Sequence, residues 1–188
     1  TKDGVVKRLA ADFQPKAEFE VISLKPGDEL VGAALSADDH ELIFVTDDAQ
    51  LLRFDANLVR PLGRGAAGMA GMKISDGAKA IFFTSIKTST TTRVLTAANN
   101  SESLGATDPG SVKVSEISEF PAKGRATGGV RAHKFIRDEN QLYFAYIGDE
   151  PVLAHTSSGK VLDLDLKLAK RDSSGTPVNA TVISAGRA

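Results

Sequence analysis

The sequence contains no cysteine and no tryptophan among its 188 residues. Without cysteine, disulfide bonds, thiolate metal sites and cysteine nucleophiles are excluded. Long apolar runs are also missing, because stretches such as residues 80–83 are far shorter than the ~20 residues that a membrane helix needs. The N-terminus lacks the basic start and apolar core of a signal peptide. We therefore expect a cytoplasmic protein that does not associate with membranes.

The chain as a whole has little excess charge, but its cations are clustered. Its net charge of -1 is not the basic balance typical of nucleic-acid binders. Residues 56–75, however, contain three cations and no acid, and residues 120–137 contain five cations and no acid. Hydrophobic residues at 41% and charged residues at 25% are ordinary for a globular chain. The sequence thus predicts a folded domain with two basic stretches.

A short phrase occurs four times: threonine, two polar residues, glycine or alanine, and then an alternating strand. We call these phrases openers; their fourth residues are Gly4, Ala49, Gly110 and Gly159. The longer middle interval contains a polar insertion in residues 97–109. Such self-similarity is typical of repeat architectures. It predicts one domain, residues 1–188, with units at about 1–45, 46–95, 96–155 and 156–188.

A second phrase, rich in glycine and basic residues, occurs in the middle of the units. Residues 63–74 parallel residues 124–135, whereas residues 14–24 have become acidic and residues 173–178 are a weak echo. Two phrases in the same order at the same period rarely arise by chance. We therefore read the sequence as a true repeat.

Each unit reads as short strands separated by turn residues. In the first unit we expect strands at residues 5–9, 19–24, 29–35 and 41–45, rich in Val, Ile, Leu and Phe. Residues 88–109 are expected to form a mobile loop, and no segment has a helical period over ten residues. Four strands in each unit of this length are typical of propeller blades. The predicted fold is all-β and propeller-like, with about four four-stranded blades.

The repeats resemble the C-terminal repeats of bacterial DNA gyrase and topoisomerase IV A subunits. Residues 3–8, 27–31, 42–46 leading into 53–54, and 60–69 carry the resemblance. It implies a β-pinwheel, a disc in which neighbouring blades exchange strands and whose basic rim bends duplex DNA. It also implies a parent topoisomerase that uses ATP and Mg²⁺ elsewhere and joins the ATPase B subunit in a heterotetramer at the nucleoid.

One departure from the family pattern concerns the type of parent enzyme. Gyrase carries a box of the form Gln-Arg-Arg-Gly-Gly-Lys-Gly in one blade, whereas residues 63–68 lack the Gln, one Arg and the Lys. Either the blade with the box lies outside this sequence, or the parent is of the topoisomerase IV type. The incomplete box favours the second alternative, a parent of the topoisomerase IV type.

The glycine-rich basic phrases predict where DNA would be held. Glycine lets a backbone approach a phosphate closely, and lysine and arginine neutralise phosphates without reading bases. The alternatives are that these cations lie in solvated turns, or that the propeller binds proteins instead of DNA. The residues predicted to contact DNA are Arg60, Arg64, Lys73, Lys123, Arg125, Arg131 and Lys134.

No residue pattern predicts catalysis, a cofactor or a metal in this domain. Gly63-x-Gly65-x-x-Gly68 matches a dinucleotide fingerprint only formally, because no helix is predicted after it. The three histidines are scattered without ligand spacing. We expect no enzymatic activity in isolation.

Overall fold

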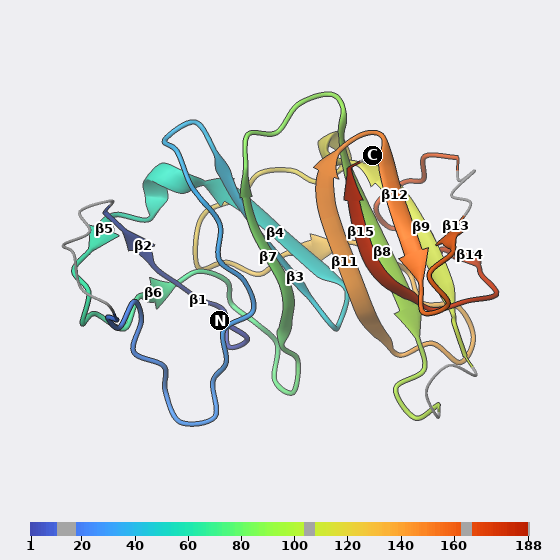
Figure 1. The fold of residues 1–188 in the computed structure, drawn as a ribbon, viewed down its shortest axis with the longest axis horizontal. Coiled ribbons are helices and arrows are strands. Elements are labelled where there is room, and N and C mark those ends of the chain that lie inside the picture. Colours follow the sequence, from blue (N-terminus) through green and yellow to red (C-terminus); the bar gives the residue numbers. More distant parts are fainter. Residues whose placement is uncertain (11–17, 104–107, 163–166, 188) are drawn as a thin grey trace.

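The computed structural model describes residues 1–10, 18–103, 108–162 and 167–187, and these are built almost entirely from strands and loops (Figure 1). The only helical elements in that part of the chain are two short 3-10 turns, η1 (Ala56–Leu58) and η3 (Ile117–Glu119). The strands are β1 (Val5–Val6), β2 (Arg8–Leu9), β3 (Glu41–Thr46), β4 (Gln50–Asp55), β5 (Pro61–Leu62), β6 (Met69–Ala70), β7 (Ala80–Ile86), β8 (Thr92–Asn99), β9 (Ser111–Glu116), β10 (Val130–Arg131), β11 (Gln141–Asp149), β12 (Val152–Thr156), β13 (Val161–Leu162), β14 (Thr176–Pro177) and β15 (Val182–Arg187).

The strands form a series of small antiparallel sheets that lie side by side along the molecule (Figure 1). Two complete blades have the strand orders β10-β4-β3-β7 and β14-β9-β8-β11. A third sheet, β13-β12-β15, corresponds to β4-β3-β7 and has no equivalent of β10 among the described strands. The two-stranded sheet β6-β1 corresponds to β10-β4 alone. The short strands β2 and β5 pair in parallel. The fold is the predicted all-β, propeller-like β-pinwheel, in which the outer strand of each blade comes from the following repeat unit.

The openers form tight turns at the ends of the blades. Gly4, Gly110 and Gly159 have φ of 81°, 65° and 75°, and Ala49 occupies the same left-handed region at 61°. Glycine is favoured there because a side chain is strained at positive φ. The threonine closes the turn, as in the bond from the Gln50 backbone N to the Thr46 Oγ1 at 3.1 Å. The repeated phrase is therefore a turn motif.

The core lies between the blades, so central strands are buried on both faces. In β3, Ile43 and Val45 belong to one apolar cluster, while Leu42 and Phe44 face another on the opposite side. Phe44 stacks against Phe54 with ring centroids 6.3 Å apart. Such two-sided burial accounts for the continuous apolar run of this strand, which departs from simple alternation.

Two strand predictions in the first unit are wrong. Residues 19–24 and 29–35 are described by the structure but form no strand. Residues 30–36 occupy the place of β7 in the repeat, and the bond from Lys2 N to Glu29 O at 2.9 Å matches that from Asp47 N to Lys79 O at 3.0 Å. Among the described residues, however, nothing takes the place of β3 beside them. Apolar alternation without a neighbouring strand does not make a sheet.

The expectation of a mobile loop over residues 88–109 is also wrong for part of this range. Residues 92–99 form β8, the central strand of a blade, in which Leu95, Ala97 and Ala98 are completely buried. The small and polar composition of this segment is typical of a loop, which is why a loop was expected. In the structure the same small side chains fit a crowded interior. The polar insertion begins only after Asn99, and residues 104–107 lie outside the described part of the chain.

Among the described residues, no helix has the length and apolar character needed to cross a membrane.

Candidate nucleic-acid interface

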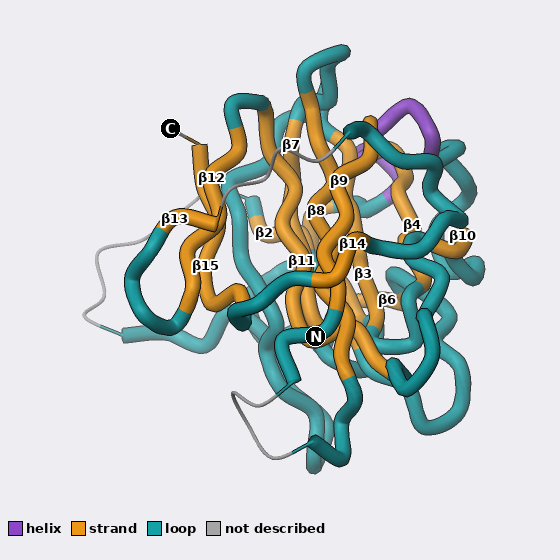
Figure 2. Tube along the Cα trace, turned by 90° about the vertical axis from the view of Figure 1, so that its right-hand side faces the viewer, coloured by secondary structure: helices purple, strands orange, loops and turns teal. Residues whose placement is uncertain are grey.

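Three segments cross from one repeat unit to the sheet of the unit before it. We call residues 60–75, 120–137 and 169–178 the crossing segments. Their short strands β6, β10 and β14 pair with β1, β4 and β9 at equivalent positions, immediately after the openers. β6 and β14 lie toward opposite ends of the molecule (Figure 1), and all three lie in the same half when it is viewed along its long axis (Figure 2). Together they form one edge of the array.

Each crossing segment is docked on an opener by the same backbone bond. The carbonyl of Gly4 accepts from Gly71 N at 2.8 Å, that of Ala49 from Ala132 N at 2.8 Å, and that of Gly110 from Val178 N at 3.0 Å. Because these bonds are made by the main chain, they recur although the side chains differ. The glycine-rich phrase is thus a docking element between units.

A glycine precedes the short strand in every crossing segment, and its role is close approach. A Cβ atom at Gly129 would lie 2.7 Å from the Leu51 carbonyl oxygen, and one at Gly68 would lie 2.8 Å from that of Val6. Side chains do not tolerate such contacts with backbone, so only glycine fits. These glycines were expected to let the backbone approach a phosphate, but their close neighbours in the structure are the strands of the preceding unit.

Neighbouring crossing segments are also hydrogen-bonded to one another. Lys73 N donates to Thr127 O at 3.0 Å, and Lys134 N donates to Ser173 O at 3.0 Å. These bonds join the three segments into one continuous ribbon along the edge. Lys73 and Lys134 therefore stand at equivalent, backbone-fixed positions on it.

Five of the seven predicted cations are exposed on this ribbon. They are Arg60, Lys73, Lys123, Arg131 and Lys134. The other two, Arg64 and Arg125, are partly buried. Arg64 lies over the Phe19 ring, with 4.6 Å between its guanidinium carbon and the ring centroid, and Lys123 donates to Gly128 O at 2.8 Å. The structure thus brings all seven onto the crossing segments.

Arg125 links two crossing segments. Its Nε donates to Leu58 O at 3.1 Å, and its Nη1 donates to Ala70 O. Arg171 repeats the arrangement one unit later by donating to Arg131 O at 3.4 Å. The arginine of the glycine-rich phrase therefore fixes the spacing of the ribbon as well as adding charge to it.

Two lysines, buried Lys113 and half-buried Lys7, hold the third and the first crossing segment. Lys113 is 2% exposed, and its Nζ donates to the carbonyls of Lys170, Arg171 and Ser173 at 3.1, 2.5 and 3.1 Å. Burial lowers the pKa of Lys113 to about 8, so the ammonium is retained at neutral pH. Lys7, at the same place after its opener, donates to Arg64 O at 2.5 Å and Ala66 O at 2.7 Å.

His133, which lies on the second crossing segment, is a buried titratable group like Lys113. Its Nδ1 is 2.9 Å from Thr96 Oγ1, and its Nε2 accepts from Gly175 N at 3.2 Å. Burial, together with the positive charge of Lys113, lowers the pKa of His133 to about 4. The neutral ring therefore joins two crossing segments within the core.

Five cations outside the ribbon are paired with carboxylates. Lys2, Arg8, Arg53, Lys87 and Arg93 all form salt bridges, such as that between Arg53 and Glu41 at 2.9 Å. In the described part of the chain, no salt bridge involves the five exposed ribbon cations named above. Their charge remains available to an anionic partner.

Sequence reasoning missed the third basic phrase. Arg171 precedes Gly175 by four residues, the same interval that separates Arg64 from Gly68 and Arg125 from Gly129. That interval was a usable signal, obscured because the surrounding residues of the last unit share little with the other two phrases. The buried anchor Lys113 had a signal too, because Lys7 also stands three residues after its opener glycine; it was not used because a lysine in an alternating strand is normally solvated.

Within the described ranges, no group of three or more His, Cys, Asp or Glu side chains is placed to bind a metal ion.

Comparisons with known proteins point to one family. A family model described as the DNA gyrase C-terminal domain, a β-propeller, matches residues 40–87 and 104–134. The A subunit of DNA gyrase from Streptomyces coelicolor is 30% identical over 174 residues, which cover 86% of this chain and 19% of that protein. The A subunit from Mycobacterium leprae is 31% identical over 169 residues, covering 86% of this chain and 12% of that protein. The chain thus spans less than a fifth of these relatives.

Solved structures share the fold at lower identity. The crystal structure of the C-terminal domain of DNA topoisomerase IV has a TM-score of 0.79 at 24% identity, covering 98% of this chain and 59% of that one. The DNA gyrase A C-terminal domain has a TM-score of 0.76 at 22% identity, covering 98% of this chain and 62% of that one.

Proposed function

Because this chain belongs to the family of C-terminal domains of type IIA topoisomerase A subunits, we propose that its ribbon of crossing segments binds and bends duplex DNA. The proposal covers both gyrase and topoisomerase IV, since the relatives named above are gyrase subunits while a topoisomerase IV domain shares the fold.

The observation that carries the proposal is the row of exposed cations without salt bridges. Five such cations lie on two of the backbone-linked segments, and in the described part of the chain none of them forms a salt bridge, whereas five cations elsewhere do. A phosphate backbone is the polyanion that such a row fits, because it presents negative charges at regular intervals. The spacing between Lys73 and Lys134 is fixed by the repeat, so successive contacts follow the edge of the array.

Binding of this kind is independent of base sequence. Lysine and arginine neutralise phosphates and release counterions, whereas base readout needs side chains placed in a groove. An edge built from successively rotated blades would hold the duplex in a bend. In the parent enzyme this domain would steer the DNA segment passed in the ATP-dependent reaction, while the catalytic residues and the ATPase B subunit lie outside this chain.

A lysine double variant tests the proposal. Lys73→Ala with Lys134→Ala removes two exposed charges whose backbone bonds remain, whereas Arg125→Ala would also break the link to Ala70. The affinity for duplex DNA at low salt should fall about equally for unrelated sequences. The dependence of log affinity on log salt should flatten by roughly two units, about 0.9 for each phosphate that is no longer neutralised.

Lys87→Ala with Arg187→Ala is the charge-matched control. Both residues are exposed and lie at the ends of β7 and β15, away from the crossing segments. This variant should retain the slope of the unmodified chain. Absence of binding at low salt, or equal losses in the two double variants, would refute the ribbon as the DNA site and favour a protein-binding propeller instead.

A further inference from the structure

Residues 18–24, which we call the acidic segment, copy the path of a crossing segment in the first unit. They lead into a turn in which Gly27 has φ of 83°, just as the first crossing segment leads into a turn in which Gly77 has φ of 80°. The two turns are closed by equivalent backbone hydrogen bonds of 3.0 and 3.1 Å. No residue is inserted between segment and turn in either case. The acidic segment therefore corresponds, position by position, to residues 68–74.

The charge of the acidic segment is opposite to that of the ribbon at the equivalent positions. Glu20 stands where Arg131 stands on the second crossing segment. Ser23 stands where Lys73 and Lys134 stand. Glu20 is exposed, and its Oε1 accepts a hydrogen bond from Ser23 Oγ, which holds the carboxylate on the segment. A phosphate at this place would meet a carboxylate instead of a cation.

The acidic segment also holds one of the ribbon arginines. The guanidinium carbon of Arg64 lies 4.6 Å from the centroid of the Phe19 ring, the geometry in which a ring face attracts a cation. Arg125, at the equivalent place one unit later, likewise reaches back to the segment before its own, where it donates to Ala70 O. The residues on both sides of Phe19 are exposed glutamates. Arg64 is thus bound to an acidic neighbour on the side where the ribbon ends.

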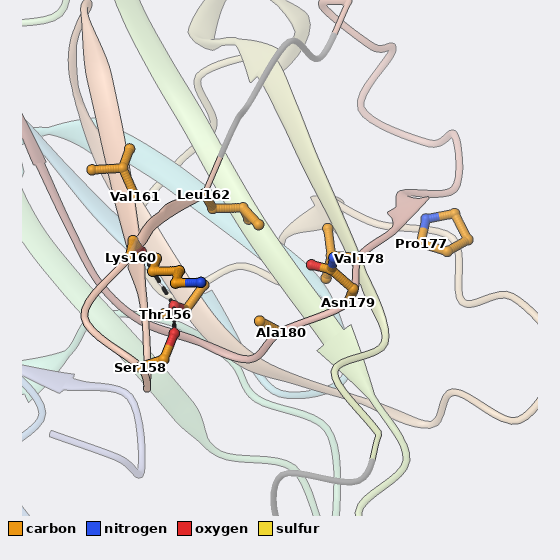
Figure 3. A pocket seen from close by; sticks show the side chains of 9 residues that line it. All are labelled: Thr156, Ser158, Lys160, Val161, Leu162, Pro177, Val178, Asn179 and Ala180. Atoms are coloured by element: carbon orange, nitrogen blue, oxygen red, sulfur yellow. Dashed lines mark hydrogen bonds between the residues drawn. The ribbon is translucent and has the colours of Figure 1, made fainter.

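The other end of the ribbon carries a cation instead. The acidic segment lies toward the end of the molecule that holds β5 and β6, whereas β14 of the third crossing segment lies toward the opposite end (Figure 1). There a groove of about 680 Å³ follows the third crossing segment, and Lys160 points toward it (Figure 3). Lys160 is the only charged side chain among the described residues that line this groove. The two ends of the ribbon therefore differ in charge.

We propose that the acidic segment is a stop at one end of the DNA track, the row of ribbon cations: it withholds Arg64 from phosphate and turns the duplex away from the first unit. The inference rests on the proposed binding of DNA by the ribbon. Carboxylates beside a duplex repel its phosphates, and at physiological ionic strength this repulsion acts over about 8 Å. The duplex is therefore held from the first crossing segment to the third, and it leaves the domain where the acidic segment begins.

Converting the stop into a crossing segment tests the proposal. Glu20→Arg with Ser23→Lys copies the cations of the second crossing segment at the equivalent positions. This variant should bind a random-sequence duplex at least about tenfold more tightly at low salt, and its dependence of log affinity on log salt should steepen by roughly two units, about 0.9 for each added phosphate contact. In hydroxyl-radical footprinting, the protected stretch of a long duplex should lengthen.

A control variant adds the same net charge away from the ribbon. Thr90→Lys, Ile183→Lys and Ser184→Lys change exposed residues of β15 and of the turn before β8. The control should steepen the salt dependence by less than half as much and should leave the footprint unchanged. Circular dichroism and melting temperature, compared for all forms, confirm that the fold is retained. Equal steepening in the two variants, or a footprint that stays the same in both, would overturn the stop.

Arg64→Ala separates withheld charge from general repulsion. In the unmodified chain this change should leave the salt dependence as it is, because the acidic segment already holds the guanidinium. In a chain with Glu18→Gln, Phe19→Leu and Glu20→Gln, it should flatten the dependence by about 0.9 unit, one phosphate contact. Equal effects in the two backgrounds would overturn the withholding of Arg64.

The proposed function and the stop fail in different ways. If Lys73→Ala with Lys134→Ala weakens binding but the converted segment behaves like its control, the ribbon remains the DNA site and the stop is refuted. If the unmodified chain binds too weakly to measure, binding gained by the converted segment and not by the control supports the stop. Absence of binding in every form at low salt refutes both.

Discussion

His133 takes the place that Met72 occupies one unit earlier, so the same interior position holds a thioether in one unit and a titratable ring in the next. The ring is 1% exposed and serves as a hydrogen-bonding partner for Thr96 and Gly175. Only the neutral form can accept the bond from Gly175 N, so its protonation state is tied to the docking of a crossing segment.

Folding stability should therefore fall in acid because of His133. The pKa of His133 is about 4 in the folded chain, against an ordinary value of 6.5. Between pH 4 and pH 6.5 the imidazole is therefore protonated in the unfolded chain but neutral in the folded chain. Stability from this residue is complete above pH 6.5 and decreases as the pH falls toward 4, by about 3 kcal/mol at roughly 1.4 kcal/mol per pH unit. Urea unfolding at a series of pH values measures it.

The matched control for this prediction is His133→Met, which copies the second unit. Carboxylates titrate in both proteins, so only the difference between their stability profiles reports on His133. The variant should be less stable at neutral pH, because bonds to Thr96 and Gly175 are lost, and should show a shallower acid slope. Parallel profiles would exclude His133 as the acid-sensitive group.

At the scale of the element, the crossing segment depends on one of two adjacent glycines. Gly129→Ala should destabilise the fold by about 1–3 kcal/mol, because its Cβ would lie 2.7–2.9 Å from the backbone of Leu51. Gly128→Ala has nothing within 4 Å and should change the unfolding free energy by no more than about 0.5 kcal/mol. Equal effects in denaturant titrations would contradict the close-approach role of Gly129.

The elements also show which parts of the fold a single sequence could predict. The openers were predictable because positive φ at residues 4, 110 and 159 favours glycine, and the threonine closes the turn. The crossing segments were recognised as repeated, but their partners were not, since pairing with the preceding unit leaves no local pattern. Residues 29–35 were misread because strand propensity does not report whether a partner strand is adjacent.

In the candidate site, too, local composition could be predicted from the sequence, whereas long-range contacts could not. Acid-free clusters of Arg and Lys identified the ribbon cations, because charge composition is visible in sequence. That Arg125 is tied to Leu58 and Ala70 was not visible, because its partners lie more than 50 residues away. Lys113 was missed for a similar reason: burial by a distant segment converts a typical surface residue into an anchor.

At the scale of the whole molecule, the ribbon should discriminate between duplexes by their stiffness. Bending a site of 20–30 base pairs by 40–90° costs on the order of 1–6 kcal/mol, and flexible steps or a single-strand gap reduce that cost. A gapped duplex should therefore compete several-fold better than an intact duplex of the same length, and a stiff A-tract should compete worse. Competition measured by fluorescence anisotropy at low salt tests this.

The Lys73→Ala, Lys134→Ala variant is informative here as well. It would remove the proposed phosphate contacts that offset the deformation energy, so its preference for gapped DNA should persist or increase while overall affinity falls. Equal affinities of the unmodified chain for gapped, intact and A-tract duplexes would show that the domain holds DNA without bending it.

The pairing of each crossing segment with the preceding unit also governs how such a domain changes during evolution. If a unit were duplicated or exchanged by recombination at the sequence boundary, its short strand would enter the sheet of an older neighbour, as β10 enters the sheet of β3 and β4. Every transferred unit would thus alter two blades at once. Because docking uses main-chain bonds and one glycine, as at Ala49 and Ala132, units of divergent sequence remain interchangeable at these joints.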